Sequence, residues 1–189
     1  VDSISGTAAA NYTLIQPTGI TGNIVQKVLT IGGSTVAANK VYDGSRNATF
    51  NGGTLNGVLS SDAANLSVTQ AGTFSQSDVG TGLVVTAANT LTGSAAVNYT
   101  LTQPTGLTAN ITPKSITITG LVASNLVYNG GTSTTLTGTP ILSNGAANAT
   151  DNKYYSVDTV SLVASGPAGV FADANVGNGK AVTLSGYTL

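Results

Sequence analysis

Aspartate is the only acidic residue in this chain, and its seven copies are the first candidates for chemistry. A calcium ion needs about six to eight oxygen ligands brought together, usually by a run of the DxDxDG type. The sequence contains no such run and no paired acidic loop. A calcium site could therefore form only where isolated side chains meet at a boundary between structural units. The candidates for such a meeting are Asp62, Asp78, Asp151 and Asp173.

Catalytic chemistry has few candidates, because the chain contains no cysteine, histidine or glutamate. These absences remove thiolate and imidazole nucleophiles, the usual zinc ligands and the commonest general base. Gly177–Lys180 has the outline of a phosphate-binding loop, but Ala174 stands where the first glycine should be and Ala181 where Ser or Thr should contact magnesium. We therefore expect no enzymatic activity, no catalytic residue, no metal and no cofactor.

The tetrapeptide VYDG at 41–44 returns as VYNG at 127–130. Asp43 could serve calcium or catalysis, but its counterpart Asn129 carries no charge. Asp or Asn followed by Gly is typical of tight turns, because these residues adopt left-handed backbone conformations at low cost. We therefore predict turns that hold the shape of the chain. The residues that form them are Tyr42, Asp43, Gly44, Tyr128, Asn129 and Gly130.

Two other groups of tyrosines are candidates for opposite roles. Tyr12 and Tyr99 each follow an Asn and precede a Thr-Leu pair, which favours a corner tyrosine whose hydroxyl ties down a neighbouring loop. Tyr154 and Tyr155, together with Phe171, could instead stack against a sugar ring or a host protein. These two tyrosines are the ligand-binding candidates of the chain.

Two covalent modifications stay open from sequence. Lys27, Lys40 or Lys114 could form an isopeptide bond with one of the many asparagines, with a buried Asp as proton shuttle. Several asparagines also lie in Asn-x-Ser/Thr patterns, which arise by chance in a chain so rich in these residues. Neither pattern establishes a modification.

These residues are organised by a tandem repeat. NYTLIQPTGITGNIVQK at 11–27 returns as NYTLTQPTGLTANITPK at 98–114, so that each shared residue recurs after 87 positions. The repeat divides the chain into the C-terminal strands of a preceding unit (1–26), one complete unit (27–113) and a truncated second unit (114–189). VYDG and VYNG lie 86 residues apart, whereas DVGTG at 78–82 and NVGNG at 175–179 lie 97 residues apart. This difference predicts an insertion of 11 residues within 139–168.

Short runs rich in Val, Ile, Leu and Thr, ended by Gly or Asn, predict strands at spacings of roughly 8 to 12 residues. No window has sustained helical periodicity. We expect an all-β chain of immunoglobulin-like sandwich units arranged end to end. The predicted strands are 12–15, 20–25, 28–31, 40–42, 48–50, 55–59, 66–70, 72–75, 83–87, 97–102 and 107–111.

Charge is scarce, since charged residues make up 7% of the chain and its net charge is −1. A basic face that could hold a phosphate backbone is absent, which argues against nucleic acid as a partner. The sequence also has no apolar run of about 18 residues and no basic amphipathic segment, so membrane insertion is not expected. A neutral surface rich in hydroxyl and amide groups is predicted.

NKVYDG at 39–44, TFSQSDVGTG at 73–82, FADANVGNGK at 171–180 and NYTLTQPTGLTANITPK at 98–114 resemble the YDG-type, mostly-β repeats of large bacterial surface proteins of the filamentous-haemagglutinin kind. The resemblance covers essentially the whole chain and supplies no catalytic residue. The chain departs from it at Asn129, in the insertion, and at Gln26, where the second copy has Pro113. The resemblance implies export from a Gram-negative cell and display in an extracellular stalk or fibre.

We therefore expect a structural repeat module of a bacterial cell-surface adhesin or fibre, with neighbouring repeats of the same chain as its partners. The alternative is a module that binds glycans or a host protein through the loop near Tyr154 and Tyr155. Residues 1–26 duplicate what the second unit lacks. Either these residues belong to a longer array from which the chain is excised, or the strands of one chain complete the second unit of another in a head-to-tail fibre.

Overall fold

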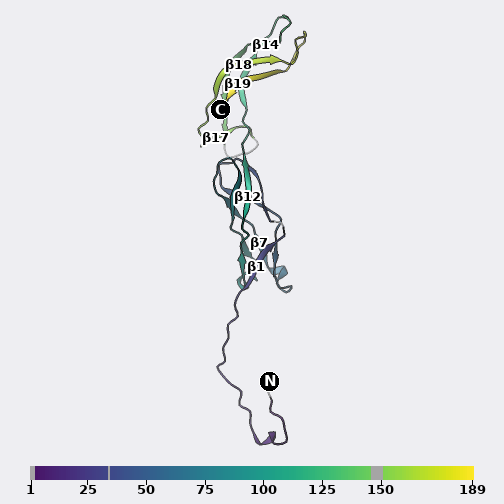
Figure 1. Cartoon of the computed structure of the whole chain (residues 1–189), viewed down its shortest axis with the longest axis vertical. Coiled ribbons are helices and arrows are strands. Elements are labelled where there is room, and N and C mark those ends of the chain that lie inside the picture. The colour runs from purple at the N-terminus through teal and green to yellow at the C-terminus, as the bar shows by residue number, and fades with distance from the viewer. Residues whose placement is uncertain (1–2, 34, 146–150) are drawn as a thin grey trace.

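The computed structural model describes residues 3–33, 35–145 and 151–189, and within them the chain is all-β with only three short 3-10 helices. The prediction of an all-β chain is confirmed. Figure 1 shows an elongated molecule in which the two units follow one another along the long axis. The segment that precedes the first unit extends away from it as a thin tail.

The first unit contains twelve strands among its described residues. They are β1 (Lys27–Gly32), β2 (Val36–Ala37), β3 (Lys40–Val41), β4 (Asn47–Ala48), β5 (Phe50–Asn51), β6 (Thr54–Asn56), β7 (Ser67–Thr69), β8 (Gly72–Phe74), β9 (Gly80–Ala87), β10 (Thr90–Thr92), β11 (Tyr99–Thr102) and β12 (Leu107–Thr112). The second unit contains β13 (Ile118–Ala123), β14 (Ser133–Thr134), β15 (Leu136–Leu142), β16 (Asn144–Gly145), β17 (Tyr154–Tyr155), β18 (Val163–Phe171) and β19 (Val182–Thr188). The 3-10 helices are η1 (Ala9–Asn11), η2 (Ala63–Asn65) and η3 (Ala96–Asn98).

Two main sheets form the first unit. The larger has the strand order β3-β12-β9-β8-β4, and the smaller has the order β11-β1-β6. Most neighbours are antiparallel, but β1 pairs with β11 and β3 with β12 in parallel. Both parallel pairs are made by the two strands of the NYTLTQPTGLTANIT stretch, β11 and β12. This stretch therefore joins the last part of the unit to the first.

Two hydrophobic clusters fill the first unit, one against each main sheet. The larger contains Phe74 and Ile111, which are 0% and 1% exposed, and the smaller is built around Leu29 and Tyr99. Alternating residues of β9 face this core, because successive side chains of a strand point to opposite sides of the sheet. The unit thus has a packed interior, although each strand is short.

The second unit repeats the strand pairs of the first in the same register. Ile31 lies opposite Leu55 in the first unit, and Ile118 lies opposite Leu142 in the second, 87 residues later on both strands. Phe74 opposite Val85 likewise becomes Phe171 opposite Val182, 97 residues later on both strands. The extra residues of the second unit therefore lie between these two pairs, within 143–170.

A one-residue deletion changes how the second unit begins. Ala37 opposite Phe50 corresponds to Ala123 opposite Leu136, at a spacing of 86 and not 87. With one residue fewer, the counterparts of β1 and β2 merge into the single strand β13, which carries a register shift at Gly120. Gly120 has a φ of 82°, and a Cβ there would lie 2.4 Å from the Thr139 carbonyl oxygen. A glycine is therefore required at this bulge.

The tail corrects one prediction. Residues 12–15 and 20–25 form no strand, although their copies at 99–102 and 107–112 form β11 and β12. Ile20 and Ile24 are 78% and 102% exposed. The sequences are nearly the same, so the difference lies in the partners, because a strand persists only where a neighbour accepts its backbone hydrogen bonds.

Candidate functional site: the junction between the units

The residues with the densest polar contacts gather where the two units meet. Tyr42 directly follows β3, and its backbone N–H donates to the Thr112 carbonyl at 2.8 Å. This bond fixes Tyr42 beside the end of β12, the last strand before the second unit. From the other side, the inserted segment brings Tyr155 on β17, which pairs in parallel with β16.

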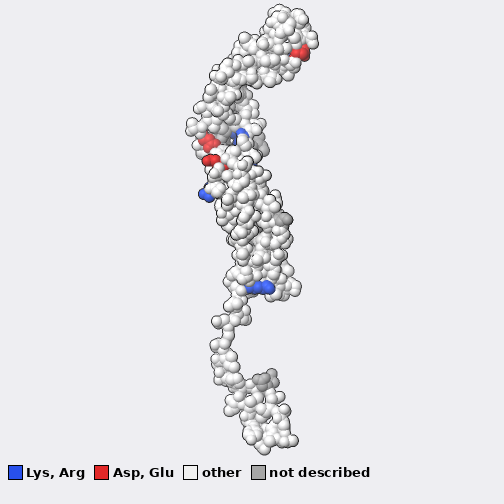
Figure 2. Space-filling model, in the orientation of Figure 1, with Lys and Arg blue, Asp and Glu red and all other residues white. Residues whose placement is uncertain are grey.

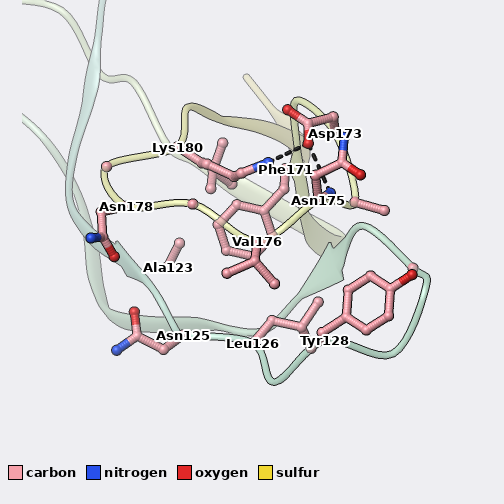
Figure 3. Close-up of a pocket in the computed structure, with 15 residues that line it drawn as sticks. Ala123, Asn125, Leu126, Tyr128, Phe171, Asp173, Asn175, Val176, Asn178 and Lys180 are labelled. Carbon is pink, nitrogen blue, oxygen red and sulfur yellow. Dashed lines mark hydrogen bonds and ion pairs between the residues drawn. The ribbon is translucent and has the colours of Figure 1, made fainter.

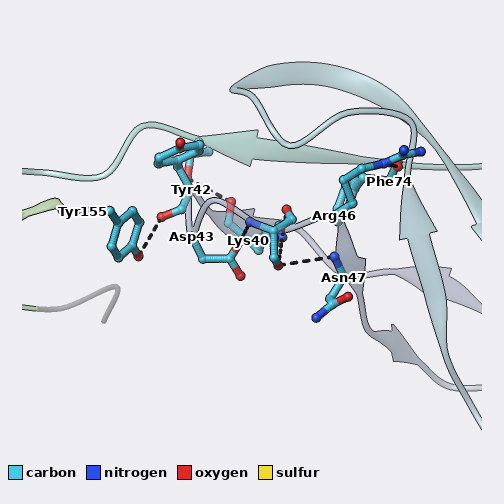
Figure 4. A network of polar contacts seen from close by, with 9 residues as sticks. Lys40, Tyr42, Asp43, Arg46, Asn47, Phe74 and Tyr155 are labelled. Atoms are coloured by element: carbon cyan, nitrogen blue, oxygen red, sulfur yellow. Dashed lines mark hydrogen bonds and ion pairs between the residues drawn. The ribbon is translucent and has the colours of Figure 1, made fainter. Parts of the chain in front are cut away.

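Tyr42 and Tyr155 connect the two units directly. The Tyr155 hydroxyl donates to the Tyr42 carbonyl at 3.2 Å, a contact visible in Figure 4, and the ring centroids lie 5.8 Å apart at 48°. The Tyr42 hydroxyl donates in turn to Oδ1 of Asp158 at 3.2 Å. Burial and the bond to Asp158 raise the pKa of Tyr42, and burial raises that of Tyr155. Both hydroxyls therefore stay protonated donors at neutral pH.

Lys114, the first residue of the second unit, is held against the inserted segment. Its side chain is 4% exposed, its Nζ lies 2.5 Å from Oδ1 of Asp151, and it also donates to the Lys153 carbonyl. The same ammonium lies 4.8 Å from the centroid of the Tyr155 ring, within the range of a cation–π contact. The hydrogen bond from Lys114 lowers the pKa of Asp151.

The VYDG turn supports Tyr42 from within the first unit. Oδ1 of Asp43 accepts from the Ser45 backbone N–H at 2.9 Å and from Lys40 Nζ at 2.7 Å. Burial raises the pKa of Asp43, but the bonds from Lys40 and Ser45 outweigh it, so that the net pKa is lowered. Figure 4 shows this network beside Phe74. The turn is thus anchored to the core that lies beneath it.

The VYNG turn of the second unit repeats this geometry without the charge. Oδ1 of Asn129 accepts from the Gly131 backbone N–H at 2.8 Å, as Asp43 accepts from Ser45. Gly44 and Gly130 have φ values of 71° and 76°. Both turns need an accepting side-chain oxygen followed by a glycine in the left-handed conformation. Asp and Asn supply that oxygen equally well.

The remaining predicted tyrosines lie in different surroundings. Tyr99 is 4% exposed, and its hydroxyl donates to Oδ2 of Asp62 at 2.7 Å and accepts from the Leu59 N–H at 3.3 Å. Tyr12, its copy in the tail, is 72% exposed, and Tyr128 is 67% exposed. The structure therefore gives Tyr99 a corner position and leaves the other two rings in solvent.

Tyr155, which the sequence suggests as a ligand-binding residue, is buried in the structure. It is 3% exposed because its ring packs between Tyr42 and Lys114. Tyr154, beside it on β17, is half-buried. Lys114 and Asp158 were not predicted as members of this site. Their contacts form only because the inserted segment folds back onto the junction, and no sequence motif predicts this conformation.

Other candidate sites of the sequence find little support in the described parts of the chain. No group of three or more potential metal-binding residues occurs there, so Asp62, Asp78, Asp151 and Asp173 do not converge. The described parts of the chain also contain no helix that is long and apolar enough to cross a membrane.

The comparisons with known proteins agree with the two-unit geometry. The family model of the YDG domain matches residues 25–106 and again residues 112–189, on either side of the junction. No curated protein and no solved structure matches the chain. Because the two matches cover most of its length, the chain belongs to the YDG domain family and carries two copies of that domain in tandem.

Proposed function

We propose that this chain is a structural segment of a bacterial cell-surface adhesin or extracellular fibre, in which it serves as a stalk. The observation that carries the proposal is the junction. Two tandem domains of one family are joined by the half-buried Tyr42, which contacts Asp158 and the buried Tyr155 of the second domain. Lys114 packs against Tyr155 from within the second domain. A spacer that must project a distant binding end needs resistance to bending at such joints.

The surface of the molecule supports the same function. Figure 2 shows few charged side chains on the face drawn, and several of them gather at mid-length, where the units meet. A chain in which only 7% of the residues are charged has a weak electrostatic field with which to attract an ionic ligand. Extracellular location and the filamentous-haemagglutinin-like setting are parts of this proposal that rest on the motif resemblance.

An immunoglobulin-like architecture of each domain also stays a proposal. Its support is the presence of two main sheets in the first unit. The two separate apolar clusters depart from a sandwich, in which both sheets share one core. The parallel pairs β1–β11 and β3–β12 depart from a strictly antiparallel sandwich. The competing function, binding of glycans or a host protein near Tyr154 and Tyr155, has less support because Tyr155 is buried.

Immunogold labelling tests the proposed function. Antibodies raised against residues 1–189 should label intact cells of the source bacterium at or beyond the outer surface, without permeabilisation. Cells from which the coding sequence has been deleted provide the control for non-specific label. Gold found only after permeabilisation would refute surface display, whatever the purified chain does in solution.

A further inference from the structure

The composition of the chain decides which side chains an oxidant can attack. Cysteine and methionine are the usual targets of biological oxidation. The sequence contains neither, and it also lacks tryptophan and histidine, so its seven tyrosines are the most easily oxidised groups. A phenol that loses one electron and its proton becomes a radical, and two such radicals couple through ring carbons next to the hydroxyl. The outcome of oxidation therefore depends on which tyrosine rings lie together.

Tyr42 and Tyr155 are the one pair of aromatic rings in contact among the described residues. Their centroids lie 5.8 Å apart and their planes are tilted by 48°, which is an ordinary geometry for packed aromatic rings. Each ring is positioned by its own unit, Tyr42 through the bond of its N–H to the Thr112 carbonyl and Tyr155 through the pairing of β17 with β16. The strands that hold the pair, β3, β12, β16 and β17, all belong to the interior of the sequence.

The surroundings of the two hydroxyls favour Tyr42 as the ring that is oxidised first. Its hydroxyl donates to Oδ1 of Asp158 at 3.2 Å, so a carboxylate is in place to take the proton when the ring loses an electron. The Tyr155 hydroxyl donates to a carbonyl, which is a far weaker base than a carboxylate. The ammonium of Lys114, 4.8 Å from the Tyr155 centroid, also opposes the loss of an electron from that ring.

Access from solvent gives the same order. Tyr42 is half-buried, whereas Tyr155 is 3% exposed. An oxidant in solution therefore reaches Tyr42, and Tyr155 loses its electron and proton to the neighbouring Tyr42 radical. Tyr42, restored as a phenol, is then oxidised a second time. Because Tyr42 follows β3 and is not itself part of a strand, its ring can approach Tyr155 further as a bond forms.

We propose that Tyr42 and Tyr155 form a dityrosine when a peroxide oxidises the chain in one-electron steps, and that this bond joins the two domains covalently. Each tyrosine gives up one electron and one proton, and a carbon–carbon bond forms between the ring positions next to the hydroxyls. The hydrogens of those two carbons move to the phenol oxygens. One molecule of hydrogen peroxide takes up the two electrons and two protons and becomes two molecules of water.

The cross-link would act on the junction as a disulfide acts elsewhere. It connects residues 113 positions apart, and a bond between distant residues stabilises the folded chain by restricting the unfolded one. The chain has no cysteine, so a tyrosine pair is the oxidative cross-link that its residue types allow. The proposal goes beyond the stalk function, because it concerns the purified chain and does not depend on where the protein resides.

Oxidation of the full chain at low concentration tests the proposal, with hydrogen peroxide and a haem peptide small enough to reach a half-buried ring. Tyr12 and Tyr128 are 72% and 67% exposed and can couple between molecules, so Phe replaces both in the test chain. Figure 3 shows Tyr128 with its hydroxyl directed away from the other labelled side chains. We expect a monomer with dityrosine fluorescence, lighter by two hydrogen atoms, that yields on digestion a pair of peptides linked through Tyr42 and Tyr155.

Three variants of the test chain identify the linked residues. Tyr155→Phe and Tyr42→Phe each remove one phenol and keep the ring, and Tyr42→Phe also keeps the carbonyl that accepts from Tyr155, so both should abolish the linked peptides. Tyr154→Phe is the matched control on the neighbouring half-buried residue of β17 and should leave the yield unchanged. Absence of linked peptides from the test chain, their persistence in Tyr155→Phe or Tyr42→Phe, or an equal loss in Tyr154→Phe would overturn the proposal.

Discussion

At the scale of single residues, the junction depends on a few polar groups that lose their contacts with water when they are buried. A buried tyrosine hydroxyl needs a partner, and Tyr155 finds one in the Tyr42 carbonyl across the domain boundary. Lys114 likewise loses nearly all contact with solvent and is compensated by Asp151 and a carbonyl. The Tyr155–Tyr42 bond crosses the domain boundary, whereas the Lys114 contacts lie within the second domain and hold the inserted segment that carries Tyr155.

Substitutions at Tyr155 should separate its packing from its hydrogen bond. We expect Tyr155→Phe to lower the free energy of unfolding by about 1 kcal/mol, since only the bond to Tyr42 is lost. Tyr155→Ala should cost about 3–5 kcal/mol, as for other buried aromatic side chains. Urea unfolding followed by tyrosine fluorescence measures both values. Tyr154→Phe, on the neighbouring half-buried residue, is the control, and equal losses in Tyr154→Phe and Tyr155→Phe would contradict the assigned bond.

At the scale of elements, the repeat allowed much of the fold to be predicted from sequence. Motif spacings of 87 and 97 residues match the offsets of the strand pairs, because homologous strands keep their register when their core residues are kept. Strand formation at 12–15 and 20–25 was predicted wrongly, because the sequence of a strand does not show whether a partner strand is present. A strand sequence such as 20–25 specifies only a capacity to pair, and the partner depends on the rest of the fold.

The candidate site was less predictable than the strands. The VYDG and VYNG turns can be predicted from sequence, because a tight turn depends only on the residues that form it. The burial of Tyr155 against Tyr42 depends on a contact between residues 113 positions apart, made by an insertion that has no counterpart in the first unit. Aromatic residues in an inserted loop therefore suggested a binding surface, whereas the loop folds back onto the junction.

Phe74 and Phe171 provide a matched test of how far each unit's core is complete. Phe74→Ala removes a side chain with no exposed area, so we expect a loss of about 3–5 kcal/mol in the unfolding of the first unit. Phe171→Ala should cost clearly less, because its half-buried ring faces a groove and lacks packing atoms on one side. Urea unfolding of the two variants measures the difference. Equal losses would mean that the groove is already filled in solution.

At the scale of the whole molecule, we expect the charges near the junction to make the alignment of the two domains depend on pH. Lys114 and Lys153 both favour the ionised form of Asp151, and its pKa is lowered from the ordinary value of 3.8. Because the folded-state pKa of Asp151 is lowered, its ionised form stabilises the folded inserted segment at every pH above about 3.8, and this stabilisation is lost as the pH falls through the folded-state value. Tyr155, which also faces Lys114, stays neutral throughout this range because its pKa is raised.

Small-angle scattering should therefore report an elongated particle of constant shape near neutral pH. Once Asp151 is protonated, Lys114 loses its counter-charge, and the inserted segment whose Tyr155 and Asp158 contact Tyr42 is held less firmly. The distribution of particle lengths should then become broader. Asp151→Asn removes the titration and should give the broader distribution even at neutral pH. Asp173→Asn is the control, since this residue pairs with Lys180 away from the junction. Scattering profiles that stay the same through acidification in the wild type, or a response to Asp173→Asn as large as that to Asp151→Asn, would mean that the ion pair does not hold the inserted segment against Tyr42.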